Sequence, residues 1–294
     1  MTFYYVQEEM GVVLKDILNK LATNNRDYLI KNTSITWINF KSNNNAKGYG
    51  FGLNNHKLIY PASIVKLVYG LAIHTWIKKG RFFLDGQIDN AVHEMLVNSS
   101  NDATSLILDL LTGTSSGASI EEDSWESWKY RRYIINDWLK ELKWDELHGL
   151  NCCQKTWEDG PYGREKDFYG DNNENINLMS TDATARILEE IMRNISYSNK
   201  NVNLKSTLSR DLKNKNIPEH VNQIKGFIGE GLPKDTPFWS KAGLMSRVRH
   251  DAAWWSNNQS NHTLLVIFGN SEEHANDRLF LPEIASAIYQ LNKD

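Results

Sequence analysis

The stretch PASIVKLVYGLA (residues 61–72) places a serine three residues before a lysine inside an otherwise apolar run. We expect a buried helix over 62–78, because apolar side chains surround it on nearly every side. Ser63 and Lys66 would then lie one turn apart on the same face. Burial favours the uncharged form of lysine, and an uncharged amine can take the proton of a nearby serine and activate it for attack. In the alternative interpretation, Ser63 caps the helix and Lys66 extends to the surface.

The composition is that of an ordinary globular protein with a large core. The chain has 294 residues, of which 40% are hydrophobic and 23% charged, and its formal net charge is -3. This charge gives no reason to expect a nucleic-acid partner. The two cysteines are adjacent, Cys152 and Cys153, and neighbouring cysteines rarely satisfy disulfide geometry. Neither a CxxC pair nor an HExxH motif occurs, so we expect no metal site and no cofactor.

The N-terminal sequence MTFYYVQEEMGVVLKDILNKL has no basic segment followed by an apolar one. It therefore does not resemble a signal peptide, and no apolar run in the chain is long enough to span a membrane. We expect a cytoplasmic protein without a membrane partner. A leader that had been removed would indicate the periplasm instead.

The first part of the chain predicts a helix followed by strands. Leucine and isoleucine recur at the spacing of one helix face over 14–21. Residues 27–40 and 49–54 have the branched and aromatic content of strands, and the Asn-rich segment 41–48 between them is typical of a turn.

The far end of the chain repeats this pattern in reverse. Strands are expected at 237–243, 249–255 and 262–270, followed by a helix that opens at Pro282. The middle of the chain is mostly helical in its pattern, over residues 62–78, 88–97, 102–112, 130–142 and 181–195.

The expected fold class is therefore α/β (α+β). An antiparallel sheet is built from both chain ends and flanked by the terminal helices, with an all-helical lobe inserted. We expect a single domain over 1–294, in which the sheet lobe comprises 1–60 and 235–294 and the helical lobe comprises 61–234.

Two further motifs accompany the serine and lysine of the opening stretch. Within MLVNSSNDATSLILDLL (residues 95–111), Ser99, Ser100 and Asn101 stand between two apolar helical runs, where polar side chains can face a cleft. In FWSKAG (residues 238–243), a lysine is followed by two small residues at the end of a strand. Small residues there would let a substrate lie along the strand edge.

The three motifs in this order, SxxK, SxN and KxG, resemble the signature of the penicillin-recognising serine hydrolases, which include class A β-lactamases and penicillin-binding proteins. ASIVKL is similar to the nucleophile helix of class A enzymes, and SSNDATSLILDLL is similar to their SDN loop and the next helix. LMSTDATARILEEI (residues 178–191) resembles the helix after their omega loop, and RHDAAWW (residues 249–255) resembles the strand after their KTG motif. The resemblance implies a β-lactamase/transpeptidase-like fold.

The resemblance also implies a nucleophile and its proton carriers. Ser63 would form the acyl-enzyme, and Lys66 would take part in proton transfer. Ser99 would relay a proton to the leaving nitrogen.

The remaining implied residues would bind the substrate. Asn101 would hydrogen-bond the amide side chain of the substrate. Lys241 would supply positive potential to the proton relay and, together with Arg249, to a carboxylate of the substrate. The backbone N–H groups of Ser63 and Leu244, beside Gly243, would form the oxyanion hole.

The sequence departs from the class A pattern at several points. Ser100 replaces the acid of SDN, and Ala242 lacks the hydroxyl found in KTG or KSG. The gap of 36 residues from Ser63 to Ser99 is short for class A. The segment 113–177 extends or replaces the omega loop, and we expect loops over residues 112–124 and 157–175.

The sequence leaves two glutamates as candidates for the base that would activate water for deacylation. Glu158 follows Trp157 as in the W-E-P context of class A, but the proline and asparagine are missing. Glu165 lies closer to the expected spacing before Thr181. Without a placed base, an acyl-enzyme would persist, as in penicillin-binding proteins.

The function expected is that of a serine hydrolase that acts through an acyl-enzyme on a small amide or ester, with weak or no turnover of β-lactams. A penicillin-binding or glutaminase-type acyl enzyme is one alternative. Another is a non-catalytic protein of the same fold that binds a partner through its Trp-rich insert, at Trp125, Trp128, Trp138, Trp144 and Trp157. The sequence leaves the natural substrate and the oligomeric state open.

Overall fold

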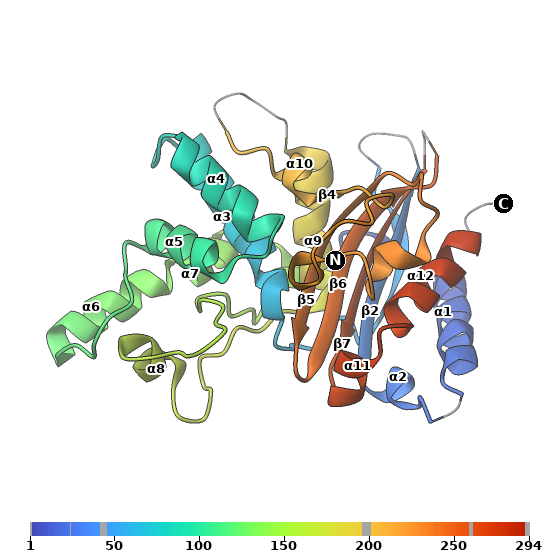
Figure 1. Cartoon of the computed structure of the whole chain (residues 1–294), viewed down its shortest axis with the longest axis horizontal. Helices are drawn as coiled ribbons and strands as arrows, with labels where there is room; N and C mark the ends of the chain where they lie inside the picture. Colours follow the sequence, from blue (N-terminus) through green and yellow to red (C-terminus); the bar gives the residue numbers. More distant parts are fainter. Residues whose placement is uncertain (1, 24, 42–45, 196–200, 259–260, 292–294) are drawn as a thin grey trace.

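A mixed sheet forms the centre of the molecule (Figure 1). The computed structural model describes residues 2–23, 25–41, 46–195, 201–258 and 261–291. Within them the sheet has seven strands in the order β1-β3-β2-β7-β6-β5-β4. All neighbouring strands are antiparallel except the short pair of β1 with β3. The strands are β1 (Tyr5–Val6), β2 (Thr33–Lys41), β3 (Tyr49–Leu53), β4 (Ser209–Arg210), β5 (Phe238–Met245), β6 (Val248–Ser256) and β7 (Asn261–Gly269).

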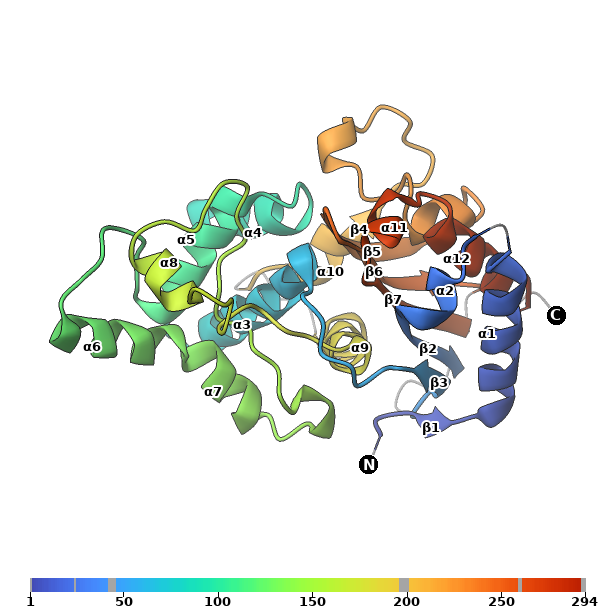
Figure 2. The same ribbon diagram turned by 90° about the horizontal axis from the view of Figure 1, so that it is seen from below.

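Helices cover both faces of this sheet (Figures 1 and 2). They are α1 (Glu8–Leu21), α2 (Tyr28–Lys31), α3 (Lys66–Lys78), α4 (Gly86–Leu96), α5 (Asn101–Thr112), α6 (Glu122–Arg132), α7 (Ile134–Glu141), α8 (Arg164–Tyr169), α9 (Thr181–Glu189), α10 (Leu204–Leu208), α11 (Glu272–Asn276) and α12 (Phe280–Leu291). Among the described helices, none is long and apolar enough to cross a lipid bilayer.

The two terminal helices pack together on one face of the sheet. Leu14 and Leu18 of α1 and Ile284 of α12 are buried in one apolar cluster with Ile35 and Ile267 from the neighbouring strands β2 and β7. Leu14 and Leu18 are four residues apart, which is the spacing that the sequence predicts for one face of this helix.

The opposite face carries the helical part of the chain. Helix α9 contacts β2, β6 and β7, and α3 packs against α9 (Figure 2). Nearly every side chain of α3 is buried, because it is apolar on all sides and lies in the middle of this group of helices. The expected architecture of a sheet from both chain ends with an inserted helical part is confirmed, and so is the fold class. The assignment of the whole chain to a single domain stays a prediction.

Several expected elements have different limits. The strand expected over 27–40 begins only at Thr33, because β2 finds its β7 partner from there on, whereas residues 28–31 form a helix that buries Leu29. The last helix begins at Phe280, two residues before Pro282, and a proline is tolerated in a first helical turn. The turn expected over 41–48 includes residues 42–45, which lie outside the described residues.

The insert contains more helix than expected. The segment expected as one helix over 130–142 belongs to two helices, α6 and α7, which meet at Tyr133. Helix α6 was missed because its sequence has no apolar face, although Trp128 and Arg132 are buried on one side of it. The segment 157–175 contains the short helix α8 instead of being loop throughout. Strand β4 comes from the part expected to be all helical and pairs with β5.

Candidate active site

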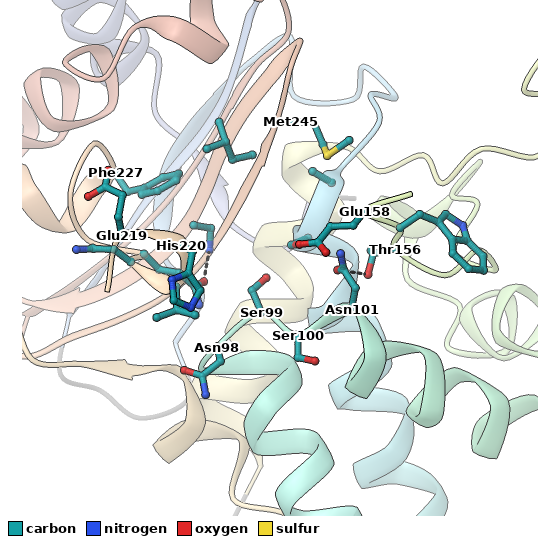
Figure 3. Close-up of a pocket in the computed structure, with 18 of the residues that line it drawn as sticks. Asn98, Ser99, Ser100, Asn101, Thr156, Glu158, Glu219, His220, Phe227 and Met245 are labelled. Atoms are coloured by element: carbon teal, nitrogen blue, oxygen red, sulfur yellow. Dashed lines mark hydrogen bonds between the residues drawn. The ribbon is translucent and has the colours of Figure 1, made fainter. Parts of the chain in front are cut away.

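A cleft of about 680 Å³ opens beside the free edge of β5. Its wall includes Ser63, the loop from Asn98 to Asp102, residues 156–158 of the insert, residues 219–223, and the end of β5. Figure 3 shows Asn101, Thr156 and Glu158 on one side, Glu219 and His220 on the other, and Ser99 between them. Clefts of this size are typical of sites for small molecules.

Ser63 lies in a tight turn that is held against the sheet. The expected helix over 62–78 begins as a 3-10 turn, η1 (Ala62–Val65), and becomes α-helical at Lys66. Ala62 has a left-handed backbone with φ of 46°, which costs on the order of 1–3 kcal/mol in a residue other than glycine. A side chain at Gly243 would come within 2.9 Å of the Pro61 carbonyl oxygen and 3.3 Å of the Ser63 nitrogen. Glycine at 243 therefore lets β5 approach the Ser63 backbone closely.

Two buried lysines meet at the hydroxyl of Ser99. The Lys66 Nζ donates to Ser99 Oγ at 3.3 Å, and the Lys241 Nζ donates to the same oxygen at 3.0 Å. Lys66 also donates to the Ser99 carbonyl and to Asn101 Oδ1 at 2.9 Å. Because the Ser99 oxygen accepts from both amines, its own proton is free to be donated into the cleft.

Burial lowers the basicity of both amines. Desolvation lowers the pKa of Lys66 to about 7. Desolvation also lowers the pKa of Lys241 well below its ordinary value, with a further contribution from the nearby positive charge of Lys66. A lysine with a pKa near 7 is deprotonated often enough to act as a base at neutral pH. Ser63 lines the same cleft, and within the described residues its hydroxyl has no hydrogen-bond partner in the protein.

The loop from Ser99 to Asn101 is held by its own polar side chains. The Ser100 Oγ accepts from the Ala103 N–H at 3.1 Å and so caps α5. The Asn101 Oδ1 accepts from Lys66 and, at 2.7 Å, from the Thr156 hydroxyl. Ser100, in place of an acid, therefore supports the loop and does not contact either lysine.

The edge of β5 beyond β4 presents backbone groups to the cleft. Strand β4 pairs only with Phe238 and Trp239. The Ala242 N–H points away from β6 and donates to Gln223 Oε1 at 3.0 Å. Leu244 follows Ala242 by two residues, so its N–H is directed to the same free edge. Its role as an oxyanion-hole donor with the Ser63 N–H stays a prediction.

The structure does not bring Arg249 into the cleft. The Arg249 Nε and Nη2 donate to the Ala275 carbonyl, and Nη1 donates to the Gly226 carbonyl. The side chain is buried and stacks on Phe227. Because Leu244 and Arg249 are cross-strand partners, Arg249 points to the sheet face opposite to that of Lys241.

The structure separates the two candidate glutamates. Glu158 is exposed and lines the cleft beside Asn101 and Thr156 (Figure 3). Glu165 is fully buried outside the cleft lining. Its Oε1 lies 2.6 Å from Arg132 Nη2 and 3.6 Å from Lys155 Nζ. Glu165 therefore joins α8 to α6, and only Glu158 remains a candidate base.

We expect Glu165→Gln to destabilise the protein by about 3–5 kcal/mol, because it breaks a fully buried ion pair and leaves Arg132, among the described residues, with only the more distant carboxylate of Asp109, at 3.6 Å. Lys155 keeps its pair with Asp109 at 2.7 Å. Urea denaturation of purified protein measures this change. Glu158→Gln is the matched control, and its exposed position predicts a change within about 0.5 kcal/mol. A Glu165→Gln protein of unchanged stability but without turnover would instead indicate a catalytic role.

Two residues of the cleft carry no sequence signal that identifies them. Gln223 bonds to Lys241 Nζ at 2.8 Å, and Thr156 bonds to Asn101. Gln223 lies in a segment without a recognisable motif, and Thr156 precedes the Trp157-Glu158 pair without being part of it, so only tertiary contacts reveal them.

The tryptophans of the insert pack within the protein. Trp128 and Trp138 are buried, and Trp125, Trp144 and Trp157 are half-buried. Trp125 stacks on Trp128, and Trp157 lines the cleft. The exposed aromatic surface that a partner-binding insert requires is therefore not formed by these five side chains.

Solved structures with this fold include penicillin-binding and β-lactam-hydrolysing proteins by name. PBP-A has a TM-score of 0.61 at 12% identity, with 99% of this chain and 98% of that chain covered. The TLA-3 extended-spectrum β-lactamase has a TM-score of 0.64 at 12% identity, with coverage of 97% and 100%. A β-lactamase from Chitinophaga pinensis has a TM-score of 0.64 at 12% identity, with coverage of 97% and 99%. At such low identity these likenesses show the fold.

The sequence comparisons identify a family. No curated protein sequence matches the chain. The family model described as the β-lactamase enzyme family matches residues 87–291, which include Ser99 and Lys241, whereas Ser63 and Lys66 precede them. Because this match spans more than half of the chain, the protein belongs to the β-lactamase enzyme family.

Proposed function

We propose that the protein is a serine hydrolase that acts through an acyl-enzyme on a small amide or ester. The observation that carries the proposal is that Ser99 Oγ accepts from both Lys66 and Lys241 in the cleft that Ser63 lines. A nucleophile, a base of lowered pKa and a hydroxyl that can donate a proton are the groups that acyl transfer requires.

In the first step, the uncharged Lys66 amine takes the Ser63 proton while Ser63 Oγ attacks the carbonyl carbon. The N–H groups of Ser63 and Leu244 stabilise the oxyanion that forms. Ser99 then donates its proton to the leaving nitrogen or oxygen and regains one from the adjacent ammonium. The bond to the leaving group breaks, and the acyl group stays on Ser63.

In the second step, water attacks the acyl-enzyme with Glu158 as the base. Glu158 is the carboxylate of the insert that lies beside Asn101 and Thr156 in the cleft (Figure 3). The water proton passes to Glu158 as the hydroxide adds to the acyl carbon. The ester bond to Ser63 then breaks, and Ser63 Oγ takes this proton from Glu158, so that Ser63, Lys66 and Glu158 return to their starting protonation states.

Covalent labelling tests the proposal directly. A fluorophosphonate and a fluorescent penicillin are each incubated with wild-type protein, and the adduct is located by mass spectrometry on the peptide that contains Ser63. A screen of esters, amides, nitrocefin and D-Ala-D-Ala peptides then identifies the acyl donors. Absence of any Ser63 adduct with every one of these compounds would support a non-catalytic binding protein instead.

We expect Glu158→Gln to slow deacylation by about 10²- to 10³-fold, because an amide cannot take the proton from water. Intact-mass spectrometry should show the acyl-enzyme accumulating in this variant while the rate of acylation is unchanged. Asp159→Asn is the matched control, since Asp159 is an exposed neighbour that does not line the cleft. An acyl-enzyme that is equally long-lived in wild type would show that Glu158 is not a base and would indicate a penicillin-binding type of behaviour.

A further inference from the structure

Gln223 lies in the wall of the cleft, and both the oxygen and the nitrogen of its carboxamide are hydrogen-bonded within the protein. Its Oε1 accepts from Lys241 Nζ at 2.8 Å and from the Ala242 N–H at 3.0 Å. Its Nε2 donates to the carbonyls of Leu96 at 3.2 Å and Val97 at 2.7 Å. The residue is 5% exposed, so these bonds fix the carboxamide in one orientation.

Gln223 completes the hydrogen bonding of Lys241. An ammonium group has three N–H donors. The acceptors of Lys241 Nζ are Ser99 Oγ at 3.0 Å, Gln223 Oε1 at 2.8 Å and the Ala242 carbonyl at 2.8 Å. Every donor of Lys241 therefore has an acceptor inside the protein, and none is left for a carboxylate of the substrate.

The other groups that could bind a substrate carboxylate are missing or engaged elsewhere. Ala242 has no hydroxyl. The Arg249 guanidinium donates to the carbonyls of Ala275 and Gly226 outside the cleft lining.

The charge of the cleft wall also disfavours an anion. Among the described residues that line the cleft, the side chains of fixed charge are the carboxylates Asp102, Glu158 and Glu219, and no lysine or arginine is among them. Glu219 is paired with Arg278 at 2.7 Å, whereas Asp102 and Glu158 face an incoming carboxylate with like charge.

From these contacts we infer that Gln223 occupies the position of a substrate carboxylate, so that this enzyme selects amide or ester substrates without an anionic group beside the scissile bond. The inference rests on the proposed function and names its substrate class. Gln223 is thus a specificity-determining residue, and its carboxamide oxygen takes the two donors that an anion would use.

The test uses two esters of one N-acylglycine that differ only in the leaving group, 3-hydroxybenzamide or 3-hydroxybenzoate. In wild type, we expect kcat/KM for the carboxamide ester to exceed that for the carboxylate ester by about tenfold or more. In Gln223→Ala, Lys241 and the Ala242 N–H are released, and the ratio should move towards the carboxylate ester by about tenfold. A ratio measured within one enzyme does not depend on how much of the protein is active.

The variant Gln223→Glu distinguishes a change of substrate specificity from a loss of the bonds that hold the loop at Leu96 and Val97. It loses the donors to Leu96 and Val97 as the alanine variant does, but its carboxylate still takes the donors of Lys241 and Ala242. We expect its ratio to stay in favour of the neutral ester.

Two results would overturn the inference: the same kcat/KM ratio in wild type and Gln223→Ala, or a wild-type preference for the carboxylate ester. The proposed function would still stand in either case if both esters acylate Ser63. The same shift of the ratio in both variants would mean that Gln223 acts only by supporting the loop, which also contradicts the inference. If neither ester nor a fluorophosphonate acylates Ser63, the proposed function and the inference fall together.

Discussion

Replacement of Ser63 by alanine is expected to reduce turnover by about 10⁴- to 10⁶-fold, the loss that follows when a serine hydrolase is deprived of its nucleophile. Without the Ser63 oxygen no acyl-enzyme can form, whereas the oxyanion hole and the charges of the cleft remain. The steady-state rate with an ester found in the substrate screen, and the mass of the protein during turnover, measure the effect.

The fold of this variant should be retained. The Ser63 side chain lines the cleft, and within the described residues its hydroxyl has no protein partner, so its removal leaves no buried group unsatisfied. Equal melting temperatures of wild type and Ser63→Ala would establish this. Ser105→Ala in α5 is the matched control, because this serine does not line the cleft. Unchanged turnover in Ser63→Ala would exclude Ser63 as the nucleophile.

The sequence predicts the elements of this fold well where the periodicity is local. The buried faces of α1 and α3 and the strands β5 to β7 follow from side-chain spacing alone. Residues 28–31 show the limit of such prediction. Their composition suits a strand, but pairing with β7 begins only at Thr33 and residues 28–31 are helical.

The candidate site is predictable only where its residues belong to short local motifs. Short motifs mark Ser63, Lys66, Ser99 and Lys241 as candidate site residues, but only the tertiary structure shows that both lysines donate to one hydroxyl. No motif marks Gln223.

Long-range contacts also decide between residues of the same type. Glu165 lies outside the cleft lining, where it pairs with Arg132, which is 33 residues away in the sequence. Arg249 is withdrawn by the carbonyl groups of Ala275 and Gly226. Such contacts leave no local pattern in the sequence, so spacing within the insert could not choose between Glu158 and Glu165.

Lys66→Met is expected to lower the rate of acylation by about 10³- to 10⁴-fold, because it removes the base that takes the Ser63 proton. In the proposed mechanism the active form of Lys66 is the uncharged amine. Since burial lowers its pKa to about 7, the rate of acylation should rise with pH through about 7 and then level. Single-turnover acylation measured between pH 5 and 9 tests this profile. An acylation rate that does not change across this range, or that survives in Lys66→Met, would reject Lys66 as the base.

The same lowered pKa predicts how Lys66 affects stability. The unfolded chain keeps the proton of Lys66 up to the ordinary value of 10.5, whereas the folded protein releases it near 7. Between these values the unfolded state binds more protons, so the contribution of Lys66 makes the protein more stable as the pH rises. Below pH 7 the folded wild type must bury an ammonium. Lys66→Met, which has a side chain of similar length without charge, does not carry this cost, but it loses the bonds to Ser99 and Asn101 at every pH. Urea denaturation of both proteins at pH 6 and pH 9 should therefore show that the free energy of unfolding of the variant, relative to that of wild type, falls as the pH rises. A free energy of unfolding of the variant that instead rises with pH relative to wild type would contradict the burial of a largely uncharged Lys66 and, with it, the base of the proposed mechanism.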